Sequence, residues 1–129
     1  MSNQMNAQSP PDSHGLTIEF TSVPAYGRYL NLKGLVHHAD SEHLRIAVYI
    51  RVHGAWWTKP YWDAPATPIS SDGSSSVDIT TGRHDEEASE IAAFLIPEEY
   101  APPGLRGEPE LPAELLAAAL ERALVTRAT

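Results

Sequence analysis

The strongest alternation of apolar and polar side chains runs from Leu44 to Val52. Every second residue of this segment is aliphatic, and the residues between are Arg45, Ala47, Tyr49 and Arg51. A period of two is the pattern of a β-strand, because successive side chains of a strand point to opposite faces. The pattern predicts a central strand with its aliphatic face in a core and its other face toward solvent.

Shorter segments carry related signals. Residues 16–20 and 30–36 also alternate, and Val77 and Ile79 indicate a short strand that ends at Gly82. Residues 91–96 are almost entirely apolar, which is typical of a strand covered on both faces. The Asp72-Gly73 pair predicts a hairpin turn. The three prolines within residues 55–69 favour a loop or an edge segment over a regular central strand.

The two ends of the chain differ in character. Residues 1–15 have only two Met and one Ala as apolar groups, so they are predicted to be a disordered tail. Residues 97–112 hold five prolines and predict a long irregular connection. The apolar spacing from Leu115 to Leu124 and its alanines favour a helix. A strand from about Ala119 to Arg127 that closes the sheet is the alternative.

Together these elements indicate an all-β domain over residues 16–127. Five or six short strands with turn signals between them, and no alternation of strands with helices, are typical of a sandwich. The long proline-rich crossings fit Greek-key connections, so the predicted fold is an immunoglobulin-like two-sheet sandwich. A short C-terminal helix before the last strand is compatible with both C-terminal signals.

Charge and composition narrow the classes of partner. The 17 acidic and 9 basic residues give a net charge of −8, and the basic residues are scattered. This argues against nucleic acid and anionic membranes as partners. The absence of cysteine excludes disulfides and thiolate zinc sites. No signal peptide and no apolar run of about 18 residues is visible, so a cytoplasmic location is the default expectation.

Aromatic residues cluster in one short segment. The three tryptophans and a tyrosine lie within seven residues, as Trp56, Trp57, Tyr61 and Trp62. Consecutive side chains of an extended segment diverge, so one of Trp56 and Trp57 should cap the core while the other faces outward. The outward ring, with Tyr61 or Trp62, would form a platform for a ligand or partner.

Two further interpretations of this segment concern its neighbours. Lys59 lies between the aromatic residues and could make a cation–π contact with them. Alternatively, the aromatic rings pack against Pro60 and Pro65 for stability alone.

No other cluster in the sequence predicts chemistry. The histidines His37, His38 and His43 lack the spacing of a rigid metal site, and His53 and His84 are isolated. The acidic run of Asp85, Glu86, Glu87 and Glu90 either favours the dipole at the start of one helical turn or is simply solvated. A nucleophile elbow, a phosphate loop and a dinucleotide fingerprint are all missing. The sequence therefore predicts a non-enzyme without a metal or cofactor.

Five sequence blocks carry a family resemblance. They are RIAVYIRVHGAWWTKPYW, PATPISSDGS, VDITTG, IAAFLIP and LPAEL. In this order they resemble a bacterial immunoglobulin-like β-sandwich accessory module, of the kind attached to extracellular carbohydrate-active enzymes. The resemblance covers residues 17–127 and is strongest over 44–97. It implies a final C-terminal strand and no catalytic role. Ser75 departs from the family, which usually has an aromatic residue there.

Two functional hypotheses follow. The leading one is a non-catalytic interaction or structural module that contacts a protein partner through Trp56, Trp57, Lys59, Tyr61 and Trp62. The alternative is a carbohydrate-binding module that stacks sugars on the same aromatic rings. A small hydrolase is the weakest reading, because no nucleophile–base pair can be named.

Overall fold

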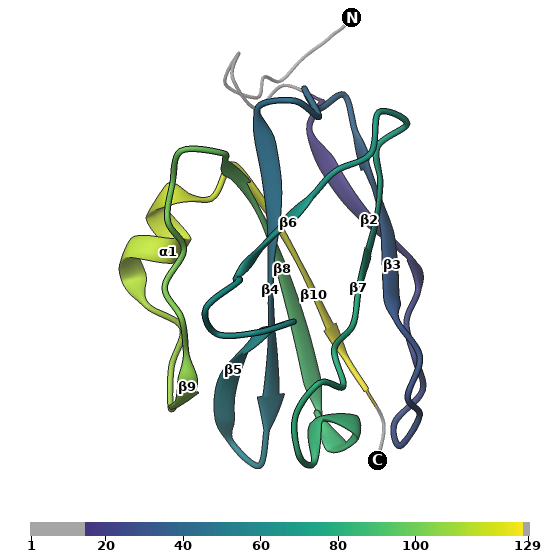
Figure 1. Cartoon of the computed structure of the whole chain (residues 1–129), viewed down its shortest axis with the longest axis vertical. Helices are drawn as coiled ribbons and strands as arrows, with labels where there is room; N and C mark the ends of the chain where they lie inside the picture. The colour runs from purple at the N-terminus through teal and green to yellow at the C-terminus, as the bar shows by residue number, and fades with distance from the viewer. Residues whose placement is uncertain (1–14, 128–129) are drawn as a thin grey trace, which may run out of the picture.

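The computed structural model describes residues 15–127, which form two antiparallel β-sheets packed face to face (Figure 1). The smaller sheet has the order β2-β3-β7, formed by β2 (Thr17–Ser22), β3 (Leu32–His37) and β7 (Ser74–Val77). The larger sheet has the order β10-β8-β4-β5-β9, and a further strand, β6, also pairs with β4. Its strands are β4 (Leu44–Val52), β5 (Ala55–Lys59), β6 (Ala66–Pro68), β8 (Glu90–Pro97), β9 (Arg106–Glu108) and β10 (Glu121–Thr126).

Helical structure is limited to two short segments of the described chain. These are the 3-10 turn η2 (Asp85–Glu87) and the helix α1 (Ala113–Ala118). The predicted two-sheet all-β fold, with a short helix before the last strand, is confirmed. The tail predicted over residues 1–15 lies, apart from Gly15, outside the described residues. Within residues 15–127 no helix combines the length and apolar character that crossing a bilayer requires.

The first core lies between the two sheets. The strand predicted from Leu44 to Val52 is β4, with the same bounds, and its aliphatic face points into this core. Strand β8 pairs along almost the whole length of β4 in antiparallel register. The smaller sheet covers this face with Leu32, Val36 and Val77. Alternation with a period of two was therefore a correct guide to the inner face of the sandwich.

A second core covers the opposite face of the larger sheet, where the sequence predicted solvent. Ala47 and Tyr49 have no exposed surface and pack with Phe94 and Leu115. Figure 1 shows α1 and the chain that precedes it lying along this side of the sheet. The Tyr49 hydroxyl donates a hydrogen bond to the Pro103 carbonyl at 2.9 Å, and burial raises the pKa of the phenol. The prediction of a solvent face failed because α1 and the connection that carries Tyr100 and Leu111 pack over this face.

Two local predictions are also corrected. Residues 55–59 form the regular strand β5 between β4 and β9, because the prolines begin only at Pro60. Asp72 and Gly73 lie in a tight turn, as predicted, in which the Gly73 N–H donates to the Ser70 carbonyl at 2.8 Å. The turn is not a hairpin of one sheet, because it connects β6 of the larger sheet to β7 of the smaller. Gly73 has a φ of +88°, and a Cβ there would lie 2.5 Å from the Val36 carbonyl oxygen. The crossing between sheets therefore requires glycine at this position.

The helix and the strand predicted as alternatives for the C-terminus are both present, one after the other. Helix α1 covers the first part of the apolar segment, and β10 then pairs with β8 from Glu121 to Thr126. Arg127 anchors the end of this strand, because its buried guanidinium donates hydrogen bonds to four backbone carbonyls. The acceptors are Pro24, Ala25, Glu86 and Ala88. Desolvation lowers the pKa of Arg127.

Candidate functional site

The structure separates the two adjacent tryptophans as expected. Trp56 is only 7% exposed, whereas Trp57 is 37%, Tyr61 56% and Trp62 54% exposed. Trp56 does not cap the core between the sheets, however. It pairs with Arg51 and so shares a face with Tyr49, in the second core. Trp56 is therefore a structural residue, and the candidate surface consists of the other three rings.

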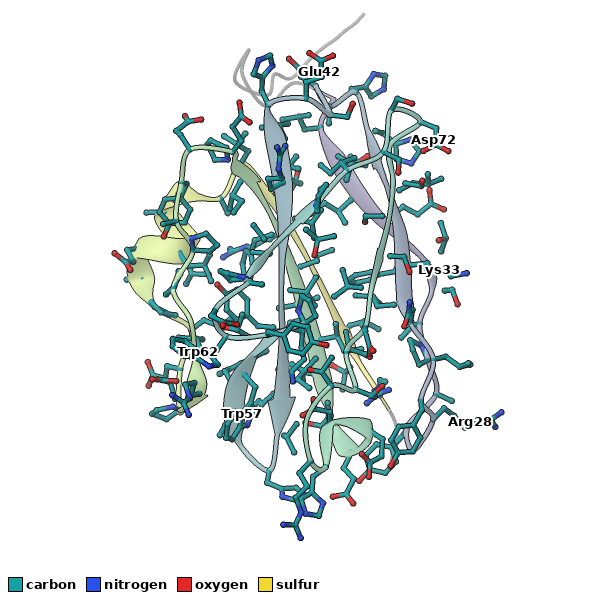
Figure 2. The ribbon with its side chains drawn as sticks, in the orientation of Figure 1. Arg28, Lys33, Glu42, Trp57, Trp62 and Asp72 are labelled. Atoms are coloured by element: carbon teal, nitrogen blue, oxygen red, sulfur yellow. The ribbon has the colours of Figure 1, made fainter. Side chains whose placement is uncertain are left out.

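These three rings line one shallow hollow of about 270 Å³, which we call the aromatic hollow. Figure 2 shows Trp57 beside β5 and Trp62 near β9, on the same side of the molecule. Two polar side chains complete the rim, Asp63 and Arg106, and both residues are exposed. The remaining lining comes from Thr58, Lys59, Pro60, Thr81, Gly82 and Leu105.

Strand β9 holds the tryptophan rings in place. Arg106 pairs with Trp57 in the sheet, and its guanidinium carbon lies 5.0 Å from the centroid of the Trp62 ring. Gly107 lies flat against Trp57, since a Cβ there would be 3.2 Å from Cζ2 of the ring. The cation on the aromatic cluster is thus Arg106 rather than the predicted Lys59. Arg106 could not be assigned from sequence because a proline-rich connection separates it from the tryptophans.

A buried ion pair lies behind the wall of the hollow, which Lys59 lines and Asp85 does not. Lys59 and Asp85 bond directly, and their side chains are only 7% and 5% exposed. Lys59 Nζ also donates to the Thr81 hydroxyl at 3.1 Å, and the Gly82 N–H donates to Asp85 at 2.6 Å. Asp85 begins η2 as predicted, but the prediction that it is solvated is wrong. Lys59 is therefore a buried, paired residue in the wall of the hollow.

The aromatic hollow also depends on close packing at Gly104. A Cβ on this residue would lie 2.6 Å from the carbonyl oxygen of Trp62. We expect Gly104→Ala to displace Trp62, to shift tryptophan emission and to cost about 1–3 kcal/mol of stability. Fluorescence spectra and urea unfolding check both effects. Gly34→Ala is the control, because a Cβ there would also meet a backbone oxygen, that of Glu19 at 2.9 Å, but in the smaller sheet. Equal emission from both variants would contradict the prediction.

The loop histidines are not brought together. His37 Nε2 lies 2.9 Å from Glu19, and His43 Nδ1 lies 2.7 Å from Asp40. The hydrogen bond between His43 and Asp40 lowers the pKa of the carboxyl and raises the pKa of the imidazole. Asp40, Glu42 and His43 form one exposed group of potential metal ligands.

Comparison with known proteins adds no relative. The chain matches no family model, and neither the curated proteins nor the solved structures contain a match. The resemblance to a bacterial accessory module therefore stays a prediction. Function has to be inferred from the geometry of the aromatic hollow and from the residues around it.

Proposed function

We propose that this domain is a non-catalytic interaction module that contacts a protein partner through the aromatic hollow. The observation that carries the proposal is the exposure of Trp57, Tyr61 and Trp62 on one concave surface. Full burial of a large apolar side chain is worth about 1.5–3 kcal/mol. Three such side chains left side by side in solvent form a surface that gains free energy when a partner covers it.

The chemistry of the rim favours a protein as the partner. Tryptophan, tyrosine and arginine are the residue types that dominate binding energy at protein interfaces. Here Arg106 stacks on Trp62, and Tyr61 lies beside it on the same hollow. Strands β5 and β9 and the Lys59–Asp85 pair hold these groups from behind. A surface that is already ordered loses little conformational entropy on binding.

The hollow's reactive groups support binding over catalysis. Lys59 and Asp85 neutralise each other, and the Thr81 hydroxyl donates to the Pro60 carbonyl. A nucleophile needs a free lone pair and an adjacent base. These three side chains are engaged with one another and with the backbone, so they hold the hollow in shape.

The strand order supports the immunoglobulin-like part of the proposal. The smaller sheet, β2-β3-β7, has the order of strands A, B and E of that fold. The order β10-β8-β4-β5 in the larger sheet corresponds to G, F, C and C′. In this assignment the aromatic hollow lies at the C′ edge, beside the short strand β9.

Carbohydrate binding is the second candidate, and one observation favours it. The hollow places Asp63 and Arg106, which can hydrogen-bond hydroxyls, next to three aromatic rings. Sugar sites combine a stacking surface with a few polar groups that fix orientation. The resemblance to modules attached to carbohydrate-active enzymes points the same way.

A pull-down with matched variants tests the leading proposal. We expect Trp62→Ala or Tyr61→Ala to reduce recovery of the bound partner about tenfold or more, since truncating an interface hot spot costs about 2 kcal/mol or more. Tyr29→Ala is the control, because Tyr29 is 67% exposed and lies outside the hollow. Quantitative mass spectrometry measures the recovery. A protein recovered equally by wild type and Trp62→Ala does not bind here.

Titration with soluble glucans separates the two candidates. Sugar stacking on Trp57 or Trp62 would change tryptophan emission, and Trp62→Ala would weaken that response. A saturable response of the tryptophan emission would identify a carbohydrate as the ligand and contradict the proposal of a protein partner. If glucans leave the emission unchanged while Trp62→Ala loses a protein partner, the carbohydrate hypothesis is ruled out.

A further inference from the structure

Two histidines that are distant in sequence meet on one carboxylate near η2. His53 occupies the turn between β4 and β5, and His84 immediately precedes η2. His53 Nε2 lies 2.8 Å from Oε1 of Glu87, and His84 Nδ1 lies 3.7 Å from its Oε2. The centroids of the two imidazole rings are 5.8 Å apart. The carboxylate of Glu87 thus has an imidazole at each of its oxygens.

We propose that His53, His84 and Glu87, with Glu86, form a binding site for a divalent transition-metal ion such as Zn²⁺. The ligand atoms of His84, Glu86 and Glu87 all lie within 4.8 Å of one another. His53 supplies a second imidazole from a separate loop. Imidazole nitrogen and carboxylate oxygen are ligands that Zn²⁺ accepts. The two carboxylates would offset the charge of a divalent ion.

The spacing fits such an ion after small side-chain movements. Ligands held at about 2.0–2.2 Å in a tetrahedron lie about 3.4 Å from one another. The His53–Glu87 and His84–Glu87 separations of 2.8 Å and 3.7 Å lie on either side of this value. His53 stands outside the group of ligand atoms within 4.8 Å, so its ring has to rotate toward His84 and Glu86 to join them. The side chains of His53 and His84 are 65% and 51% exposed, so they can rotate and an ion can reach them.

A bound ion would connect two loops that the hydrogen bonds already bring together. It would link the β4–β5 turn to η2, which carries Asp85 on its buried side. Asp85 is the partner of Lys59, which lines the aromatic hollow. The metal site would therefore hold η2 against the sheet. Its existence does not depend on the proposed function.

The chain contains a matched control group. Asp40, Glu42 and His43 also place potential ligand atoms within 4.8 Å, but they contribute a single imidazole. Figure 2 shows Glu42 at the top of the molecule, whereas η2 is the small green coil at the foot of Figure 1. If two convergent imidazoles define the site, zinc should bind near η2 and not at this second group.

Calorimetric titration of ZnCl₂ into the chelator-treated full chain tests the proposal. We expect one ion per chain and an increase in melting temperature for the wild type. His53→Asn and His84→Asn should each weaken zinc binding about tenfold or more, as losses of metal-supporting groups do. Asparagine suits both positions because His53 and His84 have φ values of 50° and 67°. His43→Asn should bind zinc as the wild type does.

Two results would overturn the proposal. One is the absence of zinc binding to the wild-type chain. The other is equal binding by His53→Asn, His84→Asn and His43→Asn, which indicates an adventitious ion only. Visible absorption of added Co²⁺ provides a second readout, since its bands report nitrogen and oxygen ligation directly. Circular dichroism of each variant verifies that a loss of binding does not come from unfolding.

Discussion

Replacing Asp85 by alanine is expected to reduce the free energy of unfolding by about 3–5 kcal/mol, because it leaves the buried Lys59 ammonium without its counter-charge. Both side chains are almost fully removed from solvent, so water cannot solvate the remaining charge. The substitution also removes the acceptor of the Gly82 N–H. Urea unfolding followed by circular dichroism measures the loss.

The double substitution Lys59→Met with Asp85→Ala is the control for this prediction. It removes the unpaired charge while methionine retains most of the apolar stem of the lysine. A buried pair replaced by apolar groups is often neutral in stability, whereas a broken pair is not. The double variant should therefore be more stable than Asp85→Ala alone. A single variant that loses less than about 1 kcal/mol would mean that Lys59 reaches solvent.

Leu115→Ala should destabilise the domain by about 2–5 kcal/mol, because it opens a cavity in the second core. Leu115 is the buried residue of α1, has no exposed surface and packs with Ala47, Tyr49 and Phe94. The neighbouring Leu116 is 38% exposed and provides a matched control. Leu116→Ala should cost about 0.5 kcal/mol, as surface substitutions do.

Urea unfolding of the two leucine variants is the measurement that decides this point. Equal losses would show that α1 does not seal the outer face of the larger sheet. A large loss confined to Leu115→Ala would show that the helix and the connection before it are part of the folding unit. Unfolding should then remain a single transition, since both cores share the strands β4 and β8.

The sequence predicted the core between the two sheets well, but it did not predict the second core on the opposite face of the larger sheet. Alternation identified β4 to the residue, because one of its faces meets an aliphatic core. It could not show that Tyr49 is buried, because Tyr49 lies between two arginines in a strand that resembles a half-solvated one. The segment that covers Tyr49 is rich in proline and distant in sequence. The proline-rich part of this segment leaves no periodic signal, and the helical spacing at Leu115 does not say which face of the sheet the helix covers.

Only the part of the aromatic hollow that follows from local strand geometry could be predicted from the sequence. Adjacent residues of a strand must diverge, so the separation of Trp56 from Trp57 followed from β structure alone. Arg106 and Asp85 were missed because each joins the site through a tertiary contact. Asp85 lies 26 residues from Lys59, in an acidic run that looks like a solvated surface. His53 and His84 were considered isolated for the same reason.

The order in which the molecule can assemble follows from its central pair of strands. Val48 pairs with Ala93, which comes 45 positions later in the chain. This loop has to close before β4 and β8 can form the sheet on which both cores pack, and closing it costs conformational entropy. Helix α1 has no sheet to dock on until that step is complete. The domain is thus expected to fold slowly for its size, with the outer layer arriving last.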